Sequence, residues 1–142
     1  MPIQMRAMEQ ADFRRGFLET LANLTAVDLT PEEAIHIWRG RNAAGVRTVV
    51  AVEDDHVIGT ASLILEHKFL HHGGTIGHIE DVAVHASAQG KGVGTGVVNA
   101  VVDMARQSGC YKVILSCTDQ NVPFYSRLGF RRHDNGMRID LG

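Results

Sequence analysis

The sequence has few of the residues that mark several large classes of protein. Its two cysteines, Cys110 and Cys117, form no CxxC pair, which argues against a disulfide framework and a zinc site. No apolar run is long enough to span a membrane, and the first ten residues lack the charged-then-apolar layout of a signal peptide. No basic run with stacking aromatics points to nucleic acid. We therefore expect a cytoplasmic protein that binds neither nucleic acid nor membrane.

The composition is that of an ordinary globular chain. With 142 residues we expect a single domain over 1–142, which is long enough to bury roughly 70% of its unfolded surface. The formal net charge of −2 indicates no polyanionic partner. Four of the eight histidines are close together, at His67, His71, His72 and His78. Since carboxylates and thiolates at ligand spacing are missing, we expect a polar loop there and no metal.

The most informative segment is the glycine-rich run Gln89–Gly96. It follows a strand-like run over 77–84 and precedes a helix-like run over 97–107. Closely spaced glycines let backbone N–H groups gather without interference from Cβ atoms, and a helix starting there adds its unpaired amides. The run therefore predicts a site for an anion such as a pyrophosphate, although a tight turn without a ligand would have the same pattern.

Two familiar nucleotide motifs do not fit this segment. A P-loop requires Ser or Thr after Gly-Lys, whereas Gly92 follows Lys91 here. A dinucleotide fingerprint requires an acidic residue at the tip of the next strand, whereas the run over 112–116 leads into Ser116, Cys117 and Thr118. Neither motif is therefore expected.

Hydrophobic spacing and turn residues predict the remaining elements. Thr30, Pro31 and Glu33 are typical of a capped helix start, and Asp54-Asp55-His56 of a hairpin turn. The predicted elements are strands over 3–6, 48–53, 57–65, 77–84, 112–116, 129–133 and 137–141, helices over 12–24, from 30, over 97–107 and over 121–128, and a polar loop over 66–75. The order predicts an α/β fold with a mixed sheet and helices on both faces.

This order, with Gln89-x-x-Gly92-x-Gly94 between the fourth strand and the third helix, resembles the GNAT superfamily of acetyl-CoA-dependent N-acetyltransferases. Four further segments resemble the glucosamine-6-phosphate N-acetyltransferase family within it. They are Glu66–Phe69, Gly77–Val84, Gly109–Lys112 and Gln120–Tyr125. The similarity runs from about Met5 to near the C-terminus, so we expect the GNAT fold, a central twisted sheet flanked by helices.

The resemblance implies acetyl-CoA as co-substrate and no metal. The fourth and fifth strands would splay apart, the backbone of Val82 and Val84 would bond the pantetheine arm, and the Val82 amide would polarise the thioester carbonyl. The implied cofactor contacts are Val82, Ala83, Val84, Gln89, Gly90, Lys91, Gly92, Val93, Gly94, Asn121, Phe124 and Tyr125. The amine would attack directly, so no Ser or Cys nucleophile is needed and Cys117 is expected to be a small buried residue.

Two of these residues have alternative interpretations. The resemblance implies that Tyr125 stabilises or protonates the departing thiolate. The alternative is that Tyr125 only packs in the core, as Phe124 and Phe130 are expected to do. Asn121 would contact the arm by resemblance, and capping of the following helix would explain it equally well.

Glu80 and Asp81 are the implied catalytic carboxylates, which touch the amine and hydroxyls of the sugar. Neighbours on a strand point to opposite faces unless a bulge intervenes, and a carboxylate on an apolar strand is costly to bury. The other implied substrate contacts are Thr25, Lys68, Phe69, Leu70, His71, Tyr111 and Lys112. For Lys68 and Lys112, a solvated surface lysine is an equal alternative.

The chain departs from the family pattern at two positions. Ser116 stands where the family has an acidic residue, so Glu80, Asp81, Asp119 or a water would have to act as base, or the substrate differs. Asp140 stands where the family has a phosphate-binding arginine. Arg138, two positions earlier on the same strand face, is our candidate to replace it.

The expected activity is acetyl transfer to a primary amine, most simply that of glucosamine 6-phosphate. The resemblance further implies a role in UDP-N-acetylglucosamine biosynthesis and a homodimer in which the C-terminal strand completes the partner's site. One alternative is a GNAT enzyme for another amino sugar, a polyamine or a protein amine. Another is a non-catalytic acyl-CoA-binding sensor.

Overall fold

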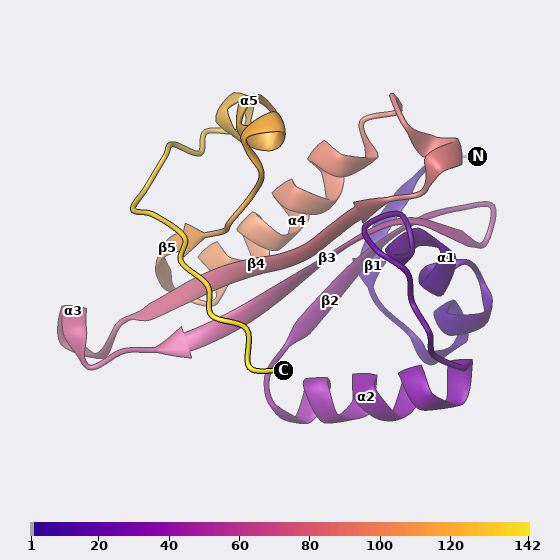
Figure 1. Cartoon of the computed structure of the whole chain (residues 1–142), viewed down its shortest axis with the longest axis horizontal. Coiled ribbons are helices and arrows are strands. Elements are labelled where there is room, and N and C mark those ends of the chain that lie inside the picture. The colour runs from indigo at the N-terminus through magenta and orange to yellow at the C-terminus, as the bar shows by residue number, and fades with distance from the viewer. Residues whose placement is uncertain (1) are drawn as a thin grey trace.

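The computed structural model describes residues 2–142, which form an open five-stranded sheet with helices on both faces (Figure 1). The strands are adjacent in chain order: β1 (Gln4–Ala7), β2 (Arg47–Glu53), β3 (His56–His67), β4 (Thr75–Val84) and β5 (Cys110–Ile114). Strands β1 to β4 are antiparallel, and β5 runs parallel to β4. The predicted mixed sheet is confirmed.

The helices cover the two faces of the sheet. They are η1 (Gln10–Arg14), α1 (Phe17–Leu21), α2 (Pro31–Ala43), α3 (Leu70–Gly73), η2 (Ala86–Ala88), α4 (Val93–Gln107), η3 (Asp119–Asn121) and α5 (Val122–Arg127). Helix α4 buries Val97 and Val101 against one face. On the other face, Phe13, Phe17 and Ile35 pack from η1, α1 and α2. None of the helices within residues 2–142 is both long and apolar enough to cross a membrane.

Two local signals in the sequence fold as predicted. Thr30 and Glu33 form a capping box at the start of α2, in which each side chain accepts a hydrogen bond from the backbone N–H of the other. Pro31 occupies the first turn. Asp54 and Asp55 both adopt left-handed backbone conformations, with φ of 50° and 63°, and close the β2–β3 hairpin.

Two predicted helix boundaries are wrong. The helix expected over 12–24 is split into η1 and α1, because Gly16 takes a left-handed φ of 97°. Helix α4 begins at Val93 rather than Val97, so the last two glycines of the glycine-rich run lie inside it. Close packing explains one of them, since a Cβ at Gly96 would be 2.2 Å from Met5 Cε on β1.

The predicted strands over 129–133 and 137–141 do not form. After α5 the chain continues to the C-terminus without helix or strand (Figure 1). Met137, Ile139 and Leu141 are 95%, 82% and 93% exposed. Their alternation with polar residues is typical of a strand, but a strand needs a neighbour to pair with, and this segment pairs with none within residues 2–142.

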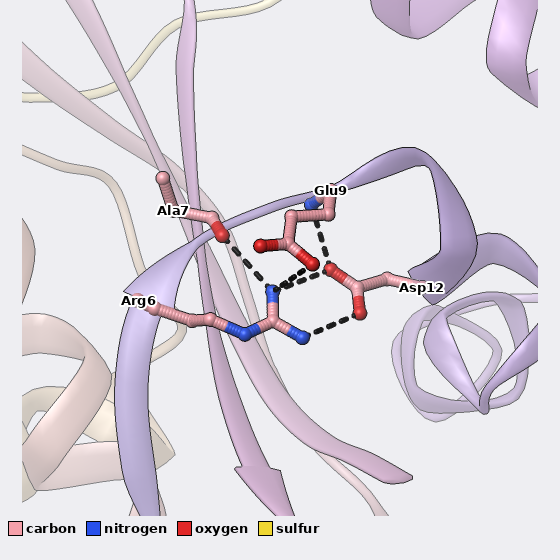
Figure 2. A network of polar contacts seen from close by, with 4 residues as sticks. All are labelled: Arg6, Ala7, Glu9 and Asp12. Atoms are coloured by element: carbon pink, nitrogen blue, oxygen red, sulfur yellow. Dashed lines mark hydrogen bonds and ion pairs between the residues drawn. The ribbon is translucent and has the colours of Figure 1, made fainter. Parts of the chain in front are cut away.

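A buried ion pair fixes the connection from β1 to η1 (Figure 2). The Arg6 guanidinium donates two hydrogen bonds of 2.8 Å to the Asp12 carboxylate, and the Glu9 N–H donates a third of 2.7 Å. Only 1% of Asp12 is exposed. Burial alone would raise the pKa of Asp12, but the bonds from Arg6 and Glu9 outweigh it and the pKa is lowered. The pair therefore holds the η1–α1 layer on the sheet.

Candidate active site

The edge of β4 is open where β4 and β5 diverge. Parallel pairing runs from Thr75 opposite Cys110 to His78 opposite Ile114; from there to Val84, β4 pairs with β3 but has no strand on its other edge. The N–H of His85 donates to a β3 carbonyl at 2.8 Å. Since backbone groups alternate in direction along a strand, those of Val82 and Val84 face away from β3, toward the gap. The two strands therefore splay as the resemblance implied.

A bulge in β4 puts both predicted carboxylates on one face of the sheet. Glu80 pairs with Ser62 and Ala83 with Thr60, so two β4 residues oppose one β3 residue, and Asp81 has a left-handed φ of 53°. Ser62 faces α2, where its hydroxyl accepts a hydrogen bond from an α2 arginine. Register places Glu80 on that same face, and Asp81 lines a cavity there. Neighbouring side chains on a regular strand would point to opposite faces, and here a bulge intervenes.

A cavity of about 440 Å³ lies against the open edge of β4. Its volume falls within the usual range for small-molecule sites. Its lining residues are Asn23, Leu24, Val82, Ala83, Val84, Ala88, Gln89, Gly90, Gly92, Val93, Gly94, Thr95, Asn121, Phe124 and Tyr125. Every predicted cofactor contact except Lys91 is among them. The ammonium of Lys91 lies instead 3.2 Å from the carboxylate of Glu53.

The glycine-rich turn supplies unpaired hydrogen-bond donors at this cavity. Gly90 and Gly92 have left-handed φ of 80° and 75°, which let the chain turn sharply into α4. Lys91 N–H donates to the Ala88 carbonyl. Within residues 2–142, five other amides of this turn have no acceptor: those of Gln89, Gly90, Gly92, Val93 and Gly94. With the N-terminal end of the α4 dipole, they form a suitable site for an anion.

Tyr125, on α5, lines the same cavity as the β4 edge and the glycine-rich turn. It is half-buried and packs edge-on against Phe124 and Phe130, with ring centroids 4.9 and 5.8 Å apart. Burial, with a smaller contribution from the Cys117 thiol, raises the pKa of Tyr125. The hydroxyl therefore stays protonated at neutral pH.

Two expectations near Tyr125 are wrong. Asn121 occupies the N-cap position just before α5, yet its side chain makes no capping hydrogen bond, and the residue lines the cavity. Cys117 was expected to be buried, but it is exposed in the segment after β5, beyond the sheet that would have covered it.

The predicted substrate contacts form two separate groups. Thr25 follows Leu24 at the cavity, near the end of β4. Lys68, Phe69, Leu70 and His71 lie in and before α3, which precedes the start of β4 (Figure 1). Tyr111 and Lys112 join the second group, because the Tyr111 ring stacks on His71 at 4.2 Å and Lys112 pairs with Ile76. Ten-residue β4 spans about 30 Å, so one chain does not bring both groups around one small molecule.

The clustered histidines have protein partners of their own. His67 Nδ1 is 3.1 Å from the Thr75 hydroxyl, and His78 Nε2 is 2.9 Å from the Glu66 carboxylate. Hydrogen bonds from His78 and then Lys68 lower the pKa of Glu66. No group of three His, Cys, Asp or Glu at metal-ligand spacing occurs in the described part of the chain.

Two positions depart from the family pattern. The residues at these positions, and those suggested to replace them, are not among the residues that line the cavity. Ser116 and Asp119 are exposed, and Asp119 lies 3.6 Å from Arg132. Arg138 donates to Asp140 at 2.8 Å and is 83% exposed in the C-terminal segment. Neither Asp119 nor Arg138 is among the residues that line the cavity at the β4 edge or the smaller cavity beside α1 and α2.

A second, apolar cavity of about 140 Å³ lies between α1, α2 and the sheet. Its polar residues are Arg41, Thr48, Thr60, Ser62 and Asp81. Asp81 and Val82, adjacent in sequence, therefore line different cavities.

Sequence reasoning missed four residues of the larger cavity: Asn23, Leu24, Ala88 and Thr95. Leu24 was expected to be the last residue of a helix over 12–24, whereas it follows α1 and is 52% exposed. Its position next to Thr25 was the available signal, since that threonine was already expected to be near the substrate.

Comparison with known proteins identifies the class. Residues 5–130 match the model of the acetyltransferase (GNAT) family, so the chain belongs to that family. A glucosamine 6-phosphate N-acetyltransferase from Trypanosoma brucei brucei is 39% identical over 98% of this chain and 96% of its own. One from Dictyostelium discoideum is 34% identical over 98% and 91%. The crystal structure of glucosamine-6-phosphate N-acetyltransferase from Arabidopsis thaliana has a TM-score of 0.94 at 33% identity and covers both chains completely.

Proposed function

We propose that this protein transfers the acetyl group of acetyl-CoA to the amine of glucosamine 6-phosphate, giving N-acetylglucosamine 6-phosphate. It belongs to the GNAT family, and its relatives with this named activity align over almost its full length. The observation that carries the proposal is the open edge of β4 leading directly into five unpaired turn amides around one cavity. Together they fit an extended amide-containing arm that ends in a diphosphate.

The β4 edge and the glycine-rich turn bind different parts of acetyl-CoA. The unpaired edge at Val82 and Val84 accepts the pantetheine arm as an added strand, and the amides from Gln89 to Gly94 bind the diphosphate. Acetyl-CoA supplies the activated thioester. The carbonyl of that thioester is polarised by the Val82 N–H, which faces the gap.

The reaction forms a C–N bond and breaks the C–S bond. The attacking amine loses one proton, which Glu80, Asp81 or a water next to them accepts. The departing sulfur gains a negative charge, and the Tyr125 hydroxyl donates a hydrogen bond or its proton to it. The raised pKa of Tyr125 suits this role because it keeps the donor protonated.

The separation of the substrate contacts along β4 supports a homodimer in which each site draws residues from both copies. The segment Lys68–His71 and the C-terminal residues would then come from the partner. Phe69 is 102% exposed and the apolar tail residues are nearly as exposed, as expected for surfaces that a second copy covers. The tail would pair as a strand only in that assembly.

A variant of Arg138 tests this arrangement. Arg138→Ala is expected to raise KM for glucosamine 6-phosphate about tenfold or more, because the loss of a guanidinium–phosphate interaction costs about 1.5–3 kcal/mol, and to leave KM for acetyl-CoA nearly unchanged. Steady-state kinetics with each substrate varied would measure both. Arg131→Ala is the matched control, since Arg131 is also exposed. Equal effects on the two KM values would reject the role of Arg138.

The proposal also includes a cytoplasmic location, a role in the synthesis of UDP-N-acetylglucosamine, and catalysis without a metal. Both thiols are free, which fits a reducing compartment. Direct attack of an amine on a thioester requires no metal chemistry.

An amine panel tests the acceptor. Release of free CoA thiol would be followed with glucosamine 6-phosphate, glucosamine, spermidine and a lysine-containing peptide. We expect the highest kcat/KM with glucosamine 6-phosphate. A faster rate with a non-phosphorylated amine would favour another acceptor, and acetyl-CoA binding without turnover on any amine would favour a sensor.

A further inference from the structure

The carbonyl of Val84, the last residue of β4, is occupied by two side-chain donors. Asn23 Nδ2 donates to it at 2.8 Å and Gln89 Nε2 at 3.2 Å. A carbonyl oxygen has two lone pairs, so both are used. This carbonyl also faces the gap between β4 and β5, where an arm added as a strand would need it as an acceptor.

Asn23 reaches this carbonyl from a distant part of the chain. It lies 61 residues away, directly after α1, and the bond is exposed to solvent. Both Asn23 and the following Leu24 line the larger cavity. From Thr25 to Leu29 no backbone N–H donates to another backbone group of the described chain, so the Asn23 side chain is a principal link between this segment and β4.

We propose that the Asn23 side chain is a displaceable tether: it donates a hydrogen bond to the Val84 carbonyl until the pantetheine arm of acetyl-CoA replaces it there. The inference rests on the proposed acetyl-CoA site. Without the arm, Asn23 holds the Val84 carbonyl and keeps Leu24 at the cavity. When an amide N–H of the arm takes that carbonyl, the Asn23 side chain is released, and the segment carrying Thr25 can adjust to the amine substrate. Asn23 is thus a positioning residue for the segment that carries Thr25.

The proposal predicts the direction in which the affinity for CoA changes when Asn23 is replaced. Asn23→Ala removes the competing donor, so CoA should bind about two- to tenfold more tightly, the worth of one exposed hydrogen bond. The nucleotide part alone, 3′-phosphoadenosine 5′-diphosphate, reaches the turn but has no arm, so its Kd should not change. Both would be measured by calorimetry. Asn99→Ala, at an exposed asparagine of α4, is the matched control and should change neither value.

Other results would contradict the proposed role of Asn23 as a tether. Weaker CoA binding by Asn23→Ala would make Asn23 a direct ligand of the arm, and unchanged binding would mean that no competition exists. Tighter binding of both CoA and the nucleotide would indicate a general change of the site. Asn23→Leu, which has a side chain of similar size but cannot donate to the carbonyl, should also bind CoA more tightly and serves if the alanine variant does not fold. Failure of the wild-type protein to bind CoA would overturn the proposed function itself.

Discussion

Tyr125→Phe is expected to lower kcat for acetyl transfer about 100-fold, the usual contribution of a positioned proton donor. The variant keeps the ring that packs against Phe124 and Phe130 and removes only the hydroxyl. Because that hydroxyl acts on the departing sulfur, KM for acetyl-CoA should stay nearly constant. Steady-state kinetics with acetyl-CoA and glucosamine 6-phosphate would separate the two parameters.

The controls for this variant concern folding and position. Since the variant keeps the ring and its packing against Phe124 and Phe130, loss of the hydroxyl should change the free energy of unfolding by less than about 0.5 kcal/mol. Tyr111→Phe, at the other tyrosine, should reduce kcat much less. An unchanged kcat for Tyr125→Phe would show that the thiolate leaves without this donor.

Asp12→Ala is expected to lower the free energy of unfolding by about 3 kcal/mol, because it leaves the Arg6 guanidinium, only 21% exposed, without its main partner. It also removes the acceptor of the Glu9 N–H. Urea unfolding with an unchanged m-value would measure the loss. Arg106→Ala, which breaks an exposed pair with Asp103, is the control and should cost less than about 1 kcal/mol.

The same pair predicts how stability depends on pH. The folded-state pKa of Asp12 lies below its usual value of 3.8, so between the two values the unfolded chain binds more protons. The contribution of Asp12 to stability is therefore complete above about pH 4 and is lost as the pH falls through the folded-state pKa. Wild-type stability should fall more steeply below pH 4 than that of Asp12→Asn. Parallel curves would contradict the assigned ion pair.

The sequence predicts the elements that depend on local chemistry. The capping box of Thr30 and Glu33 and the hairpin turn at Asp54 and Asp55 use neighbouring residues only, so both are readable from the sequence. The alternation at Met137–Leu141 is equally clear, but a strand also needs a partner edge, which a local pattern does not supply.

The site was predicted where it depends on one contiguous segment and missed where it depends on register or distance. The turn after β4 is such a segment, and its residues line the cavity as expected. The bulge at Asp81 depends on pairing with β3, so the sequence left both arrangements open. Asn23 donates a hydrogen bond to Val84 across a sequence separation of 61 residues, and no local sequence pattern predicts such a contact.

A crystal structure of the protein with bound CoA would show directly whether the open edge of β4 and the glycine-rich turn bind this cofactor. We expect that the diphosphate accepts hydrogen bonds from the amides between Gln89 and Gly94, that the arm pairs with Val82 and Val84, and that the sulfur lies beside the Tyr125 hydroxyl. Binding of CoA elsewhere, such as in the apolar cavity between α1 and α2, with the open edge of β4 left empty, would contradict this expectation.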